Sequence, residues 1–161
     1  MGSIGTALTT ARLRIRTLTA ADAPFMLTLV NQASWLRFIG DRGVRSLEDA
    51  ERYIADGPLA VHARHGFSLG LVTLKDTGAP IGVCGLIKRD SLPDPDLVFA
   101  LLAAYAGQGL AFEAASAVLQ DAFTRLGLAR VLAIATPDNE RSAALLRKLG
   151  FALEGSTASD G

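Results

Sequence analysis

Two closely spaced glycines, Gly107 and Gly109, follow an apolar run and precede a segment with helical spacing. The whole stretch, residues 96–111, is DLVFALLAAYAGQGLA and predicts a strand, a tight turn and the start of a helix. Glycines at such a turn let the backbone approach a ligand closely. The first turn of a helix has N–H groups without intrahelical partners and a partial positive charge. The stretch therefore predicts an anion site, typical of a pyrophosphate-bearing cofactor; the alternative is a tight turn with no ligand.

The other reactive side-chain types do not indicate a second site. The single Cys84 excludes an intramolecular disulfide and a Cys-rich metal site, and its apolar neighbours predict an inert core thiol. Histidine suits proton transfer near neutral pH, but His62 and His65 flank a predicted loop. The acidic residues between positions 48 and 51 predict a solvated helix face. We therefore expect neither a metal site nor a cysteine nucleophile.

Strands and helices alternate along the rest of the chain. Residues 1–10 are expected to be a flexible tail, and strict apolar–polar alternation predicts a strand over 12–18. Capping residues predict helices that begin after Thr19 and Ser46, and Gly57-Pro58 is expected to break or bend the second of them. The remaining predictions are, in order, an aromatic-rich helix over 35–39, a helical turn over 59–65, strands over 66–75, 79–89 and 97–104, a helix over 109–126, a strand over 131–135, a helix ending at 149 and the start of a strand over 151–153.

This order of elements predicts an α/β (α+β) fold with a mixed sheet, in a single domain over residues 11–161. Crossover helices in the second half of the chain predict locally parallel strands there. Neighbouring parallel strands with helix N-termini at one edge form a natural ligand crevice. The glycine turn is therefore expected at that crevice.

The composition restricts the partners of the chain. The 161 residues include 16 basic and 16 acidic side chains, so the formal net charge is zero. A general nucleic-acid or membrane-surface binder needs a basic excess, so the composition argues against both kinds of partner. No apolar run is long enough to span a bilayer, and the first residues lack the apolar core of a signal peptide. A cytoplasmic location is the default expectation.

Four segments resemble the GNAT superfamily of acetyl-CoA-dependent N-acetyltransferases, and most closely its ribosomal-protein alanine N-acetyltransferase branch. The segments are LRIRTL, TGAPIGVCGLIKRD, DLVFALLAAYAGQGLAFEAA and PDNERSAALLRKLGF, and the resemblance covers residues 12–153. It implies a mostly antiparallel twisted sheet flanked by helices, with a splayed parallel strand pair at the cofactor site. It also implies acetyl-CoA as co-substrate, no metal, and a primary amine as acceptor.

The cofactor loop of that family has the pattern Arg/Gln-x-x-Gly-x-Gly/Ala. The matching positions here are Ala106, Gly107, Gln108, Gly109, Leu110 and Ala111. The first position departs from the pattern, because alanine lacks the polar side chain of arginine or glutamine. The resemblance implies that the loop from Gly107 onward cradles the pyrophosphate of acetyl-CoA. It also implies that the backbone of Leu102 and Ala103 pairs with the pantetheine arm, and that a backbone N–H near Leu102 stabilises the oxyanion.

Asn139 and Ser142 resemble two further site residues at the start of the last predicted helix. In the family the asparagine contacts the pantetheine arm, and the alternative is a plain helix N-cap. Many relatives place a tyrosine general acid seven residues after this asparagine, where this chain has Leu146. In the ribosomal-protein branch a serine resembles the alternative acid, and Ser142 holds its position; the other interpretation is a helix-surface serine.

Asp96 is the candidate general base, because relatives often have a carboxylate near the amine at the start of this strand. The alternative is a solvated loop residue. Glu113 resembles a glutamate that buttresses the cofactor loop. Trp35, Arg37 and Phe38 are candidates for lining the acceptor pocket between the early helices and the hairpin. The alternative for the two aromatics is the core, and for the arginine a solvated surface.

The relatives continue after the Gly150-Phe151 pair with a strand hairpin, whereas this sequence ends at Gly161. We therefore expect a truncated hairpin, which leaves the site open or lets a second copy complete the sheet in a homodimer. The resemblance implies acetyl transfer from acetyl-CoA to a protein N-terminus or a small-molecule amine, by direct attack in a ternary complex. The alternative is a catalytically weak or inactive GNAT-like CoA-binding module. An unrelated nucleotide-binding domain is disfavoured, because no Gly-x-Gly-x-x-Gly follows the first strand.

Overall fold

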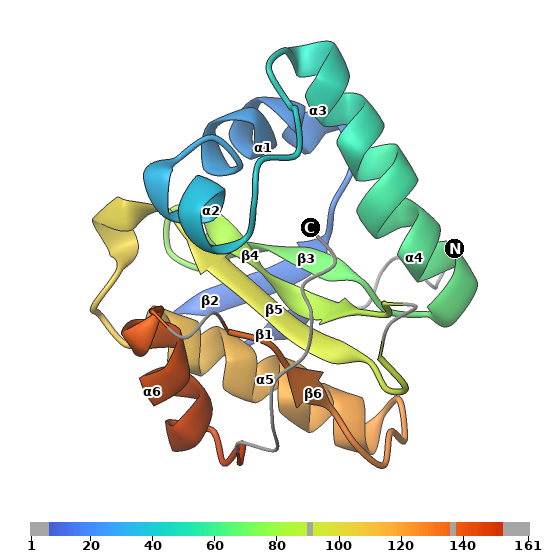
Figure 1. The fold of residues 1–161 in the computed structure, drawn as a ribbon, viewed down its shortest axis with the longest axis vertical. Helices are drawn as coiled ribbons and strands as arrows, with labels where there is room; N and C mark the ends of the chain where they lie inside the picture. The colour runs from blue at the N-terminus through green and yellow to red at the C-terminus, as the bar shows by residue number, and fades with distance from the viewer. Residues whose placement is uncertain (1–6, 90–91, 136–137, 153–161) are drawn as a thin grey trace.

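A computed structural model describes residues 7–89, 92–135 and 138–152 of the chain. One sheet contains six strands in the order β1-β2-β3-β4-β5-β6, and only the β5–β6 pair is parallel. The strands are β1 (Leu8–Thr9), β2 (Leu13–Thr17), β3 (Leu69–Leu74), β4 (Pro80–Ile87), β5 (Asp96–Leu101) and β6 (Leu132–Ala133). Helices flank the sheet on both sides (Figure 1). The predicted mixed, mostly antiparallel architecture is confirmed.

The helices of the first half of the chain cover one face of the sheet (Figure 1). They are η2 (Ala20–Asp22), α1 (Ala23–Leu29), α2 (Ala33–Phe38), α3 (Leu47–Ile54), η3 (Ala55–Leu59) and α4 (Ala60–His65). The predicted caps hold: Thr19 and Asp22 form a capping box, and the Ser46 hydroxyl accepts the N–H of Asp49 at 3.1 Å. Side chains from α1, α2, α3, β3 and β4 form the core on this face, including the fully buried Trp35.

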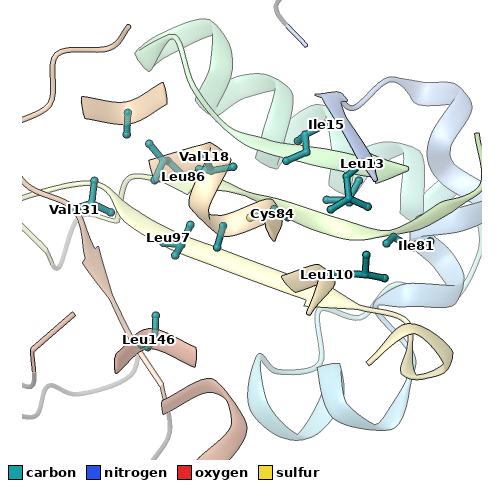
Figure 2. Close-up of a cluster of buried hydrophobic side chains, with 14 residues drawn as sticks. Leu13, Ile15, Ile81, Cys84, Leu86, Leu97, Leu110, Val118, Val131 and Leu146 are labelled. Carbon is teal, nitrogen blue, oxygen red and sulfur yellow. The ribbon is translucent and has the colours of Figure 1, made fainter. Parts of the chain in front are cut away.

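The helices of the second half cover the opposite face. They are the short η4 (Ala103–Tyr105), α5 (Leu110–Thr124) and α6 (Glu140–Lys148). Figure 2 shows the core between this layer and the sheet, where Leu13 and Ile15 of β2, Cys84 of β4 and Leu97 of β5 meet Val118 of α5. The protein therefore has two hydrophobic cores, one on each face of a central sheet, and α5 is positioned by the larger of them.

Two local predictions differ from the structure. Residues 8 and 9 were expected in a flexible tail but form β1, which pairs with Ile15 and Arg14 of β2; a two-residue strand is too short to show alternation in the sequence. Of the two outcomes expected at Gly57-Pro58, a break is wrong, because the chain passes through this pair as a π-helical segment. A wider turn of this kind accommodates a residue that lacks an N–H.

The end of the chain tests the last strand prediction only in part. Phe151 and Ala152 lie in no strand, and residues 153–161 lie outside the described residues. In the part of the chain that the structure describes, no helix is both long and apolar enough to cross a membrane.

The parallel pair separates early, which matters for the site. The register of β5 on β6 consists of Asp96 with Leu132 and Leu97 with Ala133. β5 continues to Leu101, and on its other edge it stays paired with β4 along its whole length. The second half of β5 therefore has one edge that β6 does not pair.

We predict that Leu13→Ala lowers the free energy of unfolding by about 2–5 kcal/mol. Leu13 of β2 is 0% exposed in the core shared with α5, and truncation of its side chain leaves a cavity. Urea denaturation measures this change. The matched control is Leu36→Ala on α2, where the side chain is 38% exposed and the expected change is about 0.5 kcal/mol or less. Equal losses in the two variants would contradict the assignment of the core.

Candidate functional site

The open edge of β5 presents backbone groups in the direction away from β4. Alternate residues of a strand direct their N–H and C=O groups to opposite edges. The N–H of Leu102 donates to Ile81 O of the β4 side at 2.8 Å, so the even-numbered residues face β4. Phe99 and Leu101 therefore direct their polar backbone groups to the open edge. The Leu102 N–H thus already bonds Ile81 O, and the N–H groups near Leu102 that face the open edge are those of Leu101 and Ala103.

The predicted glycine turn lies at the end of this edge. Gly107 and Gly109 have φ angles of 79° and 78°, in the left-handed region that disfavours other residues. Gly109 is the N-cap of α5, and residues 106–109 are all exposed. Leu110 is buried at 3% exposure in the larger core, so it anchors the start of the helix. The turn thus combines exposed backbone with the unpartnered N–H groups of a 15-residue helix.

Glu113, in the first helical turn of α5, supports the glycine turn through Thr10 and Arg12. Its carboxylate accepts hydrogen bonds from the Thr10 hydroxyl, from the Arg12 N–H at 2.8 Å and from Arg12 Nε at 2.7 Å. Arg12 Nη1 in turn donates to Gln108 O at 3.1 Å. Burial acts to raise the pKa of Glu113, but the bonds from Thr10 and Arg12 outweigh it and the pKa is lowered. The carboxylate therefore stays charged and holds the β1–β2 turn against the loop.

Gln32, the residue before α2, bonds the end of β5 through its side-chain amide. Its Nε2 donates to Leu101 O at 2.8 Å, and its Oε1 accepts the N–H of Ala103 at 3.2 Å. One side-chain amide thus joins the helices on one face of the sheet to the end of β5. Sequence reasoning missed this residue, because nothing local distinguishes this glutamine from a solvated one.

Asp96, the candidate base, is the first residue of β5 and is 0% exposed. Its Oδ2 accepts from Arg89 Nε at 3.1 Å, and its Oδ1 has no hydrogen-bond partner among the residues that the structure describes. Burial raises the pKa of Asp96, against the opposing effect of Arg89. The alternative of a solvated loop residue is excluded. By strand alternation Asp96 shares a face with Val98, on the side covered by α1 to α4.

The start of α6 contains both polar residues expected at the cofactor. Asn139 Oδ1 accepts the N–H of Ser142 at 3.2 Å, so the asparagine is the N-cap of α6. Ser142 is half-buried. Leu146, at the position where many relatives have tyrosine, packs into the core with α5 and β6 side chains (Figure 2).

The three predicted acceptor residues of α2 have different surroundings. Trp35 is 1% exposed in the core, which favours the alternative interpretation over the lining of the acceptor pocket, and its Nε1 bonds no group within the described part of the chain. The guanidinium of Arg37 lies over the Phe38 ring at 4.7 Å from the ring centre. Arg37 Nη2 also pairs with Asp138 Oδ2 at 3.1 Å, which links α2 to the residue before the α6 cap.

Cys84 and the acidic residues offer no alternative chemistry. Burial raises the pKa of the Cys84 thiol to about 12, so the thiol stays protonated and unreactive. Within residues 7–89, 92–135 and 138–152, no cluster of three or more His, Cys, Asp or Glu side chains is placed to hold a metal ion.

Comparison with known proteins identifies the family. A family profile described as "Acetyltransferase (GNAT) domain" matches residues 12–152. The chain belongs to the GNAT acetyltransferase family. A curated relative is the uncharacterized N-acetyltransferase YoaA of Bacillus subtilis, which is 29% identical over 149 residues, 92% of this chain and 84% of that protein. The predicted family and the predicted class of enzyme, an acyl-CoA-dependent N-acetyltransferase, are confirmed.

Solved structures share the GNAT fold. An acetyltransferase from Agrobacterium tumefaciens superposes with a TM-score of 0.83 at 27% identity, covering 97% of this chain and 89% of that one. RimL, a ribosomal L7/L12 alpha-N-protein acetyltransferase solved in complex with coenzyme A, superposes with a TM-score of 0.81 at 20% identity, covering 93% of this chain and 86% of that one. At 20% identity this second likeness shows the fold alone.

We predict that Glu113→Gln destabilises the protein by about 1–3 kcal/mol at pH 7, because charge-assisted bonds from Thr10 and Arg12 are lost. The pKa of Glu113 is lowered by folding, so its stabilising contribution is present above the pKa of the unfolded glutamate, about 4.3, and is lost as pH falls through the folded value. Thermal melting of wild type and variant between pH 7 and 3 measures the difference.

The matched control for this experiment is Glu51→Gln, on the exposed surface of α3. We expect it to change stability by about 0.5 kcal/mol or less at every pH. A Glu113→Gln penalty that stays constant down to pH 3 would show that the carboxylate charge does not brace the loop.

Proposed function

We propose that this protein transfers an acetyl group from acetyl-CoA to a primary amine, with the pyrophosphate at the Gly107–Gly109 turn and the pantetheine arm along the open edge of β5. One observation carries the proposal: the exposed glycine turn at the N-terminus of α5 lies where the unpaired edge of β5 ends. A single ligand with an anionic part and an extended amide-bearing arm satisfies both features.

The turn suits a pyrophosphate because it concentrates positive potential without a basic side chain of its own. The first N–H groups of α5 carry the positive end of the helix dipole. Arg12 is 50% exposed, and its Nη2 lies 3.5 Å from the position that a Cβ on Gly109 would occupy. This guanidinium adds charge beside a loop in which Ala106 replaces the family's polar residue.

The open edge suits the pantetheine arm because its amides can pair with strand backbone. Phe99 and Leu101 present N–H and C=O groups there, and the N–H of Ala103, one of the two residues expected to pair with the arm, lies on the same edge. The RimL structure, which shares the fold, contains coenzyme A, and this supports the same class of ligand here. The thioester that acetyl-CoA supplies needs a donor for its developing oxyanion, and we assign this role to a backbone N–H of this edge.

Direct transfer also requires a proton acceptor for the amine and a proton donor for the departing thiolate. We assign the base to Asp96, which lies at the opposite end of β5 from the turn, about 20 Å of extended chain away. Burial raises the pKa of Asp96, which makes its carboxylate a better proton acceptor than an exposed aspartate. We assign the donor to the Ser142 hydroxyl, with Asn139 as the residue that fixes the start of α6. The base, the acid and the cofactor contacts are all parts of this proposal.

The acceptor approaches from the side of α1, α2 and α3, because Asp96 and Val98 face that layer. On α2, Arg37 is exposed and Phe38 is half-buried, and we assign both to the acceptor site. Both a protein N-terminus and a small-molecule amine fit this assignment, since the balanced charge of the chain selects neither. RimL acts on a ribosomal protein N-terminus, which makes a peptide with a free N-terminus the first acceptor to test.

We predict that acetyl-CoA binds with an affinity that follows the charge at position 106. Ala106 is exposed with an ordinary φ of −70°, so Ala106→Arg and Ala106→Glu introduce charge without backbone strain. The arginine should strengthen binding and the glutamate weaken it, each by about twofold to fivefold, from favourable or repulsive contact with the pyrophosphate. Isothermal titration calorimetry with acetyl-CoA measures the three dissociation constants at one salt concentration.

Three equal dissociation constants would place the pyrophosphate elsewhere. Turnover of acetyl-CoA with a panel of amines, detected as free thiol, then separates the enzyme from the alternative of a CoA-binding module. Binding with no turnover of any amine favours the binding module, which the leucine at the usual tyrosine position also favours.

A further inference from the structure

The Gln32 amide occupies the edge of β5 in the way that a neighbouring strand would. It donates to Leu101 O at 2.8 Å and accepts the Ala103 N–H at 3.2 Å. In a parallel sheet, one residue bonds the C=O and the N–H of two residues that are two positions apart on the next strand. A single side-chain amide thus replaces strand backbone at Leu102, beyond the point where the β5–β6 register ends.

The Gln32 amide bonds backbone groups of Leu101 and Ala103 with which the pantetheine arm would pair. The inference rests on the proposed function, in which the arm pairs with the open edge of β5 beside the turn. A carbonyl oxygen has two lone pairs, so Leu101 O can accept from Gln32 and from a second donor. A backbone N–H has one hydrogen, so the Ala103 N–H serves one acceptor at a time. Gln32 and a pantetheine carbonyl therefore compete for Ala103.

We propose that Gln32 is a competitive clasp: its amide holds the end of β5, and the pantetheine arm of acetyl-CoA displaces it. The turn itself is not part of this competition, because it is held through Gln108 O by Arg12, which in turn pairs with Glu113. Gln32 therefore opposes binding of the arm and leaves binding of the pyrophosphate unaffected.

Displacement of the Gln32 side chain from β5 also affects α2, the helix that carries the proposed acceptor residues. Gln32 is the N-cap residue of α2, the helix that contains Trp35 and Arg37. Its backbone carbonyl accepts the N–H of Leu36 at 3.1 Å, as the N-cap of α2. Its side chain instead bonds Leu101 and Ala103 at the edge of β5. Release of the side chain disconnects α2 from the cofactor edge before the acceptor binds.

The test compares CoA with the fragment of CoA that keeps the adenosine and the pyrophosphate but lacks the pantetheine arm. In Gln32→Ala we expect CoA to bind about threefold to tenfold more tightly than in wild type, because the bond from the Ala103 N–H to Gln32 Oε1 no longer opposes it. We expect the fragment to bind wild type and variant equally. Calorimetric titration gives all four dissociation constants, and Gln32→Leu, which keeps the side-chain bulk, repeats the comparison if the alanine variant is poorly folded.

The control is Asn31→Ala, which removes the neighbouring amide. Asn31 Nδ2 donates to Leu27 O and Val44 O, both at 2.8 Å, and both acceptors lie away from β5. This variant should lose stability but keep the wild-type affinity for CoA and for the fragment. It therefore separates general loosening of the α1–α2 link from release of the β5 edge.

Each outcome has one meaning. Weaker binding of both CoA and the fragment in Gln32→Ala would show that Gln32 braces the loop and would overturn the clasp, as would unchanged binding of both. A wild-type protein that binds the fragment but not CoA, and whose Gln32→Ala variant binds CoA, would support the clasp in its strongest form. A wild type and variants that bind neither would overturn the proposed function together with the clasp.

Discussion

The early end of the β5–β6 pairing is the constraint on which the site depends. The pairing of β5 with β6 stops at Leu97 and Ala133, although β5 continues to Leu101. Backbone N–H and C=O groups need partners wherever they are buried, so an open strand edge inside a fold calls for a substitute. This structure supplies one such substitute from the Gln32 side chain, and the proposed function supplies the other from an amide-bearing ligand.

The rest of the chain holds that edge and the adjoining turn from several sides. β4 pairs with the whole opposite edge of β5, and α5 packs against β2, β4 and β5 through the larger core. Arg12 and Glu113 hold the glycine turn against the β1–β2 turn, more than 90 residues away in the sequence. Both sides of the turn are thus fixed, while residues 106–109 stay exposed. Rigid support around exposed backbone is what binding of an extended cofactor requires.

The sequence predicted those features that depend on local residue types. The glycines at 107 and 109 permit the left-handed backbone of the turn, and the Thr19 and Ser46 caps mark where helices begin. Alternation predicted β2, and all of these features were found. The family was also recognised from local motifs, and the profile match confirms it. Local chemistry therefore gave the fold class, the turn and the family.

The features that the sequence did not predict depend on long-range pairing. Whether the Leu102 N–H faces β4 or the open edge follows from the β4–β5 register, and a one-residue change of register would reverse it. Asp96 is buried because Arg89 and the strands around it enclose it, although the prolines before it indicated a solvated loop. The bonds from Gln32 to β5 span about 70 residues and leave no mark in the local sequence.

Amide hydrogen exchange with and without acetyl-CoA tests most directly whether the open edge of β5 binds the cofactor. The Leu102 N–H serves as the internal reference, because it already bonds Ile81 O at 2.8 Å. Our account predicts that acetyl-CoA slows exchange at the Phe99 and Leu101 amides and at the first amides of α5, with little change at Leu102. Protection of the α5 amides without any change at Phe99 and Leu101 would contradict it.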